Sequence, residues 1–295
     1  MLTSHDFTNR ARQRLRVQTG TALAACLLAG AVLGCNQSAS SVTGADPSAA
    51  APASAAPAAI ETELIVSAAA SLREAFTALG EQFKRSHPGV ELRFNFAGTQ
   101  ELRTQLEQGA AVDVFASADE RHMDDLVRAG RAAGPVIFAR NELVIVVAKD
   151  AAAKIRTLAE LPQVEQLVIG TPEVPIGRYT LQILDRAAAT LGADFRTKVE
   201  AKVASRELNV KQVLAKVRLG EAQAGIVYRS DARSDSELTL VAIPANINVV
   251  PRYPIAVVTG APHPTLARAF VALVVSQVGQ RALSDAGFMP VAATQ

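Results

Sequence analysis

Cysteine is nearly absent from this chain of 295 residues. Its two cysteines, Cys26 and Cys35, both precede residue 36. This excludes a disulfide, a cysteine-ligated metal site and a cysteine nucleophile from residues 36–295. Tryptophan is missing and only three tyrosines occur. An iron site built from clustered tyrosine, histidine and acidic side chains therefore has few residues to draw on.

An excess of one charge is also lacking. The chain has 30 Lys and Arg against 28 Asp and Glu, a formal net charge of +2. Residues 1–35 hold four arginines against one acid, Asp6, which leaves about −1 for the rest of the chain. No basic tract indicates a nucleic-acid partner. Hydrophobic residues reach 49%, but much of this is alanine, so the composition does not indicate a membrane protein.

The first apolar run is short. Residues 21–34 form an uncharged segment that is too short to span a bilayer and has the length of a signal-peptide core. The sequence Val32-Leu33-Gly34-Cys35 resembles a bacterial lipobox, which predicts export, cleavage and lipidation at Cys35. A plain signal peptide with an incidental cysteine is the alternative. Residues 1–35 are thus expected to be a lipoprotein signal peptide.

Residues 36–61 are mostly alanine, serine and proline. Such a composition cannot bury a core, so it predicts a disordered tether between the membrane and a folded body. The expected location is the periplasm, with the protein anchored to a membrane through Cys35.

From residue 62 onward, short β-branched runs alternate with amphipathic segments, which predicts an α/β fold with largely parallel sheet. The expected strands are 63–68, 90–96, 112–116, 143–148, 167–170, 224–228, 238–243 and 255–258. The expected helices are 71–87, 99–108, 119–129, 177–191, 210–219 and 264–275.

Two strand-to-helix junctions in the first half present hydroxyl residues. Ser71 stands three residues before Glu74, a spacing that predicts a capping box at the start of a helix. Thr99 follows Gly98 at the next junction. Capping alone would explain either residue, but their parallel placement favours an anion site at two helix N-termini.

Three further positions lie at junctions in the second half. Ile176 precedes Gly177 in a loop that opens a long helix, and Asn209 is the expected N-cap that leaves the Val210 N–H free. Tyr228 ends a strand, where its hydroxyl would either point into a cleft or simply pack at the strand end.

Catalysis lacks support in the sequence. Neither G-x-S-x-G nor H-E-x-x-H occurs, and the histidines after the leader stand singly. A hydrolase that uses Ser71 as nucleophile would need a base, and none is identifiable beside it. Arg178, Arg229 and Arg252 stand near the junctions and would pair with an anion or, as we expect, form structural or solvated ion pairs.

The body resembles the ModA family, the molybdate-binding periplasmic components of ABC importers. The segments that carry the resemblance are Ala68-Ala-Ala-Ser71-Leu, Phe96-Ala-Gly98-Thr99-Gln-Glu-Leu, Ala110-Ala-Val-Asp-Val-Phe-Ala-Ser-Ala-Asp119, Val174-Pro-Ile-Gly-Arg-Tyr-Thr and Ala224-Gly-Ile-Val-Tyr-Arg-Ser-Asp-Ala232. In order and spacing they cover nearly all of residues 62–295.

The resemblance implies a two-lobed, type II periplasmic binding protein with mostly parallel sheets, helices on both faces and two crossing strands at the hinge. We expect one lobe from residues 62–140 with 253–295 and the other from 141–252, with the crossings near Phe138–Leu143 and Val249–Ile255. Carried over by position, the molybdate contacts are Ser71, Thr99, Ile176, Val210 and Tyr228. Thr99 stands where the family frequently has serine, which keeps the hydroxyl. Ile176 stands where alanine is frequent, which is harmless if only its backbone N–H binds and otherwise would crowd the pocket.

The implied ligand is molybdate or tungstate, which the sequence does not separate. Molybdate is a fully deprotonated dianion, so its site needs donors and no carboxylate. Sulfate would use the same donors, whereas hydrogen phosphate would need an acceptor that the five positions do not supply. We expect a monomeric binding protein, not an enzyme, that delivers its ligand to an ABC permease. We expect it to use no cofactor and to hold molybdenum only within the oxyanion.

Overall fold

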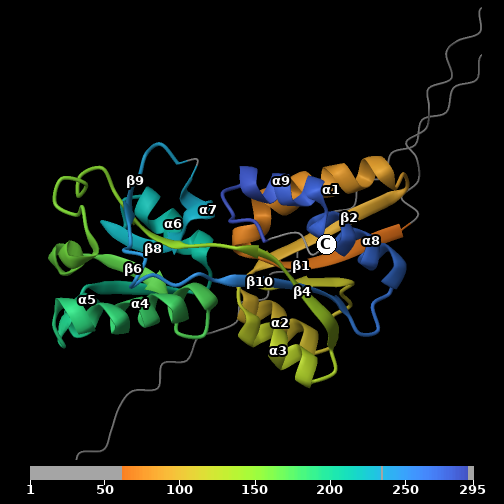
Figure 1. Ribbon diagram of the computed structural model, residues 1–295, viewed down its shortest axis with the longest axis horizontal. Helices are drawn as coiled ribbons and strands as arrows, with labels where there is room; N and C mark the ends of the chain where they lie inside the picture. Colours follow the sequence, from red (N-terminus) through yellow and green to blue (C-terminus); the bar gives the residue numbers. More distant parts are fainter. Residues whose placement is uncertain (1–61, 234, 292–295) are drawn as a thin grey trace, which may run out of the picture. The chain divides into compact units, whose positions relative to one another are not determined.

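Two five-stranded sheets, each with helices on both faces, make up the part of the chain that the structure describes (Figure 1). The structure is a computed structural model and describes residues 62–233 and 235–291. The predicted signal peptide, Cys35 and the tether lie outside these ranges. The described residues belong to one unit of the chain.

The first sheet has the strand order β2-β1-β3-β10-β4. Strand β1 is parallel to β2 and β3, while β10 is antiparallel to β3 and β4. Helices α1, α8 and α9 cover one face and α2 and α3 the other (Figure 1). The strands are β1 (Thr62–Ala69), β2 (Val90–Ala97), β3 (Val114–Ala116), β4 (Ala132–Arg140) and β10 (Arg252–Val258). The helices are η1 (Ala70–Leu72), α1 (Arg73–Ser86), α2 (Thr99–Glu107), α3 (Glu120–Arg128), α8 (Pro264–Val275) and α9 (Gln277–Asp285).

The second sheet has the order β7-β6-β8-β5-β9. Strand β6 is parallel to β7 and β8, while β5 is antiparallel to β8 and β9. Helices α4 and α5 lie on one face and α6 on the other (Figure 1). The strands are β5 (Leu143–Val147), β6 (Leu167–Gly170), β7 (Val203–Glu207), β8 (Ala224–Tyr228) and β9 (Thr239–Ala242). The helices are η2 (Leu158–Gln163), α4 (Pro175–Leu191), α5 (Phe195–Glu200), α6 (Val210–Arg218) and α7 (Arg229–Ala232).

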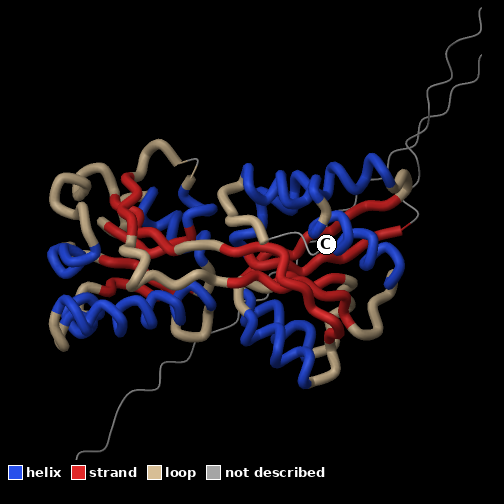
Figure 2. The backbone as a smooth tube through the Cα atoms, in the orientation of Figure 1, coloured by secondary structure: helices blue, strands red, loops and turns tan. Residues whose placement is uncertain are grey.

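The chain passes between the two sheets twice (Figure 2). Residues 141–142 join β4 to β5, and residues 243–251 lead from β9 back to β10. The backbone N–H of Asn141 donates to the carbonyl of Pro251 at 3.0 Å, so the two connections are hydrogen-bonded to each other. This pair of adjacent connections is the place where the two halves would rotate relative to each other.

The predicted α/β architecture is confirmed, but each sheet is mixed rather than mostly parallel. The reason is that β10 and β5 are the strands that enter each sheet from the other one, and both run against their neighbours. Strand β4 was not predicted because it contains Gly134 and Pro135. Proline is tolerated there because β4 is an edge strand, where a missing N–H interrupts no inner ladder.

Aliphatic side chains of both sheets lie in the core. Leu64 and Val66 of β1, and Ile145 and Ile226 of β5 and β8, are fully buried. Strand β7 was missed because it lies at an edge and its sequence, VASRE, has no run of large apolar residues. Among the described residues, no helix has the length and apolar character needed to cross a membrane.

Candidate functional site

All five residues predicted to bind the ligand line a single cavity. It lies where strands of both sheets end. The lining residues come from the β1, β2 and β3 ends of the first sheet and the β6, β7 and β8 ends of the second. They are Ala69, Ser71, Gly98, Thr99, Ala118, Val174, Pro175, Ile176, Asn209, Val210 and Tyr228.

Ser71 is at the cavity, but the predicted capping box is wrong. Ser71 lies inside the short helix η1, and α1 begins only at Arg73, with Leu72 as its N-cap and no side-chain cap bond. The tight 3₁₀ turn, inserted between β1 and α1, moves the serine away from the capping position. Its Oγ instead lies 3.2 Å from the hydroxyl oxygen of Tyr253 on β10, and both side chains are buried.

Thr99 is the first residue of α2, and Gly98 is the N-cap. The Oγ1 of Thr99 accepts a hydrogen bond from the N–H of Ala118 at 3.2 Å, so its own hydrogen remains available for the cavity. Glu101 accepts from the N–H of Gly98 at 2.9 Å and thereby satisfies one of the unpaired donors of this helix start.

Ile176 and Val210 lie in the first turns of α4 and α6. Pro175 opens α4, and it has no N–H, so the N–H of Ile176 is the first donor of that helix. Asn209 is the N-cap of α6, as predicted, and its Oδ1 accepts from the N–H of Gln212 at 3.1 Å. First-turn N–H groups have no acceptor within their helix, so both positions bring free donors and a partial positive charge to the cavity.

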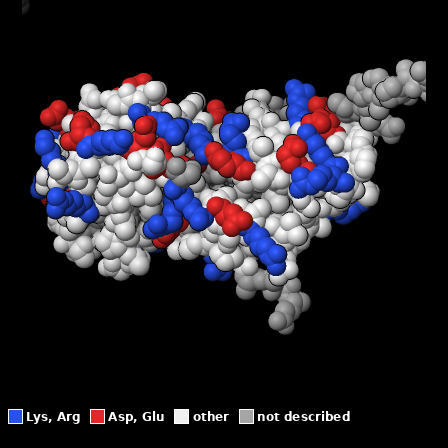
Figure 3. Space-filling model, turned by 90° about the horizontal axis from the view of Figure 1, so that it is seen from above, with Lys and Arg blue, Asp and Glu red and all other residues white. Residues whose placement is uncertain are grey.

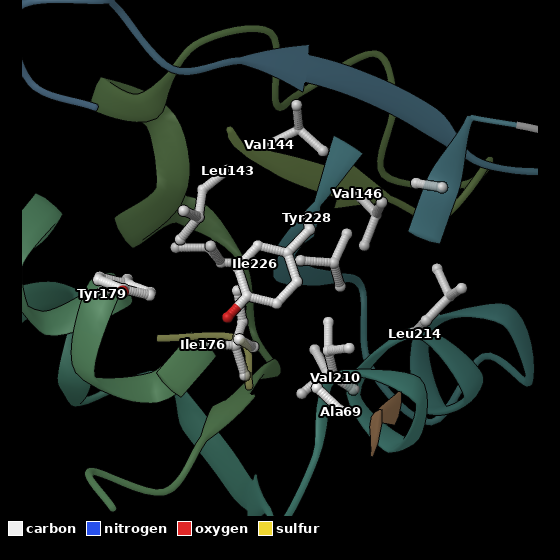
Figure 4. Packing of buried hydrophobic residues seen from close by; sticks show 14 of the residues in the cluster. Ala69, Leu143, Val144, Val146, Ile176, Tyr179, Val210, Leu214, Ile226 and Tyr228 are labelled. Atoms are coloured by element: carbon white, nitrogen blue, oxygen red, sulfur yellow. The ribbon is translucent and has the colours of Figure 1, made fainter. Parts of the chain in front are cut away.

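Tyr228 ends β8 and is buried, and its hydroxyl has no hydrogen-bond partner among the described residues. Figure 4 shows this hydroxyl on the side of Ile176. Burial raises the pKa of Tyr228 well above its ordinary value, so the group stays protonated. A buried hydroxyl without a partner costs about 1–3 kcal/mol, and an acceptor in the cavity would relieve that cost.

Among the residues that the structure describes, no charged side chain lines the cavity. Its polarity comes from three hydroxyls and from the N-terminal ends of helices. Figure 3 shows positive and negative side chains interspersed on one face of the molecule, without a large area of one sign. The arrangement therefore selects an anion through oriented neutral donors, and it offers no carboxylate to accept a proton from the ligand.

Several contacts join the first sheet and its helices to the second beside the cavity. Arg178 Nη2 lies 2.8 Å from Oδ2 of the buried Asp119, and Lys211 Nζ lies 2.8 Å from Glu74 Oε1. Gln100 Nε2 donates to the carbonyl of Leu208 at 2.8 Å. The pairing of these residues could not be read from the sequence, because the partners are 59 to 137 positions apart.

The three arginines near the junctions all form ion pairs, as expected. Arg178 pairs with Asp119, Arg229 with Glu142 and Arg252 with Glu120. None of them lines the cavity. Within residues 62–291 no group of three or more histidine, aspartate or glutamate side chains could hold a bare metal ion. The sequence did not single out Tyr253 or the Gln100–Leu208 contact.

Comparisons with known proteins agree with this geometry. The family of bacterial extracellular solute-binding proteins matches residues 64–289. The molybdate-binding protein ModA of Mycobacterium tuberculosis strain H37Rv is 42% identical over 271 residues, which cover 91% of this chain and 96% of the relative.

Two solved structures share the fold. The periplasmic molybdate-binding protein of Azotobacter vinelandii superimposes with a TM-score of 0.69 at 19% identity, over 78% of this chain and 100% of that one. The sulfate-binding protein SubI of Mycobacterium tuberculosis superimposes with a TM-score of 0.69 at 21% identity, over 78% of this chain and 88% of that one. The matched family and relatives are solute-binding proteins. The chain therefore belongs to the bacterial extracellular solute-binding proteins, together with the ModA proteins, and is a binding protein rather than an enzyme.

Proposed function

We propose that this chain captures molybdate, or the similarly shaped tungstate, and delivers it to the permease of an ABC importer. The unpartnered Tyr228 hydroxyl in a cavity without charged side chains carries the proposal. It indicates a ligand that only accepts hydrogen bonds, as a fully deprotonated tetrahedral dianion does. The ModA relative, whose name states molybdate binding, supports the same ligand.

The proposed contacts come from two lobes, residues 62–140 with 253–295 and residues 141–252. The first lobe supplies the hydroxyls of Ser71 and Thr99. The second supplies the N–H groups of Ile176 and Val210 and the hydroxyl of Tyr228. Because both lobes contribute, a bound anion stabilises the closed form, and closure is what the permease would recognise. Ile176 takes part through its backbone, so its side chain does not prevent binding.

The energies are compatible with tight binding. Five hydrogen bonds to a charged acceptor, at about 1.5–3 kcal/mol each, give a gross stabilisation of roughly 8–15 kcal/mol. Association costs about 4–15 kcal/mol, so the donors must be well placed before the ligand arrives. The packing of all five residues supports such preorganisation, since each is almost completely buried.

The test is a thermal-shift panel on the purified protein with molybdate, tungstate, sulfate and phosphate. A ligand that binds only the folded state raises Tm, by an amount that grows with its concentration relative to Kd. We expect molybdate and tungstate to raise Tm most and to displace sulfate and phosphate in calorimetry. No shift at millimolar molybdate, or phosphate as the tighter ligand, would reject the proposed function. Tighter sulfate binding would make the chain a sulfate carrier of the same fold.

We also propose that the mature protein is a monomer anchored through a lipid on Cys35. The lipobox pattern at residues 32–35 supports the anchor. Cys35→Ser should move the protein from the membrane fraction to the soluble fraction, with molybdate binding unchanged. Unchanged partitioning would favour a plain signal peptide.

A further inference from the structure

Tyr253 lies directly behind the cavity wall. It belongs to β10, at the point where the chain returns to the first sheet, and it is fully buried. Its ring packs edge-on against the rings of Phe138, Tyr228 and Phe288, with centroid distances of 6.3, 5.8 and 5.4 Å. Tyr253 does not line the cavity, but its hydroxyl oxygen is 3.2 Å from Ser71 Oγ. The three ring contacts fix where that hydroxyl lies.

The contact between Ser71 and Tyr253 uses one hydroxyl hydrogen, and its direction decides what Ser71 offers the ligand. If Ser71 donated to Tyr253, it would have no hydrogen left and would present lone pairs to a dianion. If Tyr253 donates, Ser71 keeps its hydrogen for the cavity. Burial raises the pKa of the Tyr253 hydroxyl well above its ordinary value, while the hydrogen bond with Ser71 offsets part of that rise. The phenol therefore remains protonated and able to donate.

The proposed ligand favours the second direction. A fully deprotonated dianion only accepts hydrogen bonds, so a hydroxyl that binds it must do so through its hydrogen. Ser71 lines the cavity and Tyr253 does not, so the hydrogen shared between their two oxygens comes from Tyr253. The order of donation then runs from Tyr253 to Ser71 and to the ligand.

We propose that Tyr253 is a positioning residue that holds Ser71 as a donor and thereby favours fully deprotonated oxyanions over those that carry a proton. This inference rests on the proposed function and deepens it. Hydrogen phosphate must donate its proton, and the acceptors nearest to it would be hydroxyl oxygens. Thr99 Oγ1 already accepts from Ala118, and Ser71 Oγ accepts from Tyr253. If either hydroxyl also accepted from the ligand, its own hydrogen would no longer point at the ligand and would lose that acceptor, so a protonated anion is disfavoured.

The test is a double-mutant cycle with Tyr253→Phe and Ser71→Ala, measured by calorimetry with molybdate and with inorganic phosphate in slightly alkaline buffer. We expect Tyr253→Phe to weaken molybdate binding about tenfold in the wild-type background and by less than about twofold when Ser71 is already alanine. We also expect the ratio of molybdate to phosphate affinity to fall in Tyr253→Phe, because Ser71 is then free to turn and accept.

Two controls separate this role from a structural one. Tyr179→Phe removes another largely buried tyrosine hydroxyl, one that does not belong to the cavity lining, and should leave the selectivity ratio unchanged. The ligand-free Tm of each variant reports folding. The inference would be overturned if Tyr253→Phe weakened molybdate binding equally in both backgrounds, or if it left the ratio of molybdate to phosphate affinity unchanged. If the wild-type protein bound no tetrahedral oxyanion, the proposed function itself would fail, which is a different result.

Discussion

Gly98 gives the most direct test of lobe closure. Its backbone angles, φ −61° and ψ 139°, are open to any L-residue, so alanine fits the local conformation without strain. A Cβ at this position, however, would lie 2.3 Å from the carbonyl oxygen of Leu208. Gly98 precedes α2 in the first lobe and Leu208 precedes α6 in the second. Gly98→Ala therefore penalises the closed arrangement, while within the first lobe the flexible Gln100 amide, 2.5 Å from that Cβ, has to shift.

The size of the effect follows from that distance. Real Cβ atoms essentially never approach another atom closer than 3.0 Å, so the two backbones must separate by roughly 0.7–1 Å. The Leu208 carbonyl is two residues from Val210, so the separation moves a ligand donor and lengthens the Gln100–Leu208 hydrogen bond. A displacement of about 1 Å costs on the order of 100-fold where geometry matters. We expect Gly98→Ala to raise the Kd for molybdate by about 30- to 100-fold.

The assay is calorimetry with molybdate, together with the Tm of the ligand-free protein. Gly98→Ala should leave the ligand-free Tm close to that of the wild type. Gly80→Ala is the matched control, because its Cβ would lie 2.7 Å from the Phe94 ring within the same lobe. It should lower Tm and leave the Kd of the folded protein nearly unchanged. Wild-type affinity in Gly98→Ala would refute closure onto Leu208, and so would a large loss of ligand-free stability.

Two further predictions concern charged groups. Arg178→Met leaves Oδ2 of the buried Asp119 without its cation in the closed form. The molybdate Kd measured by calorimetry should therefore rise about 30-fold, which corresponds to about 2 kcal/mol of binding free energy. A Kd equal to that of the wild type would contradict this prediction. Burial raises the pKa of Asp231 to about 6 from an ordinary 3.8, although Lys211 opposes the shift. Because the folded-state pKa is the higher one, its stabilising contribution is complete below about pH 4 and is lost as the pH rises through 6. In urea titrations, the free energy of unfolding of Asp231→Asn should rise by about 2 kcal/mol relative to that of the wild type between pH 4 and pH 7. A difference that stays constant with pH would disprove the assignment.

The sequence was sufficient to predict the cavity's residues because each stands at a strand-to-helix junction. Ser71, Thr99, Ile176 and Val210 follow β-branched or aromatic strands and precede amphipathic helices, and such junctions gather at one edge of a sheet. Local sequence was enough to predict the capping role of Asn209, which is confirmed. It was not enough for Ser71. The spacing to Glu74 fits a capping box, but one turn of 3₁₀ helix moves the serine to a different role.

Long-range pairing could not be predicted from local sequence. Tyr253 lies 182 residues after Ser71, and nothing near it in sequence indicates which side chain its hydroxyl meets. The backbone angles of Gly98 are ordinary for any residue, and the absence of a side chain matters because another backbone lies close by. These features depend on how the two sheets meet, which no periodicity within a single segment encodes.

The near neutrality of the body now has a physical interpretation. Residues 62–295 carry 26 Lys and Arg against 25 Asp and Glu, and the charged groups nearest the cavity neutralise one another, as Arg178 and Asp119 do. An unpaired cation in the cavity wall would attract phosphate as strongly as molybdate, because Coulomb attraction does not depend on the ligand's protons. Oriented hydroxyl and N–H donors do distinguish these two ligands, since each donor hydrogen points at a ligand oxygen that has to accept it. Under the proposed function, discrimination against phosphate therefore depends on the direction of the hydroxyl hydrogens of Ser71 and Thr99, and neutralising a surface arginine outside the lobe contacts should leave the molybdate-to-phosphate ratio unchanged.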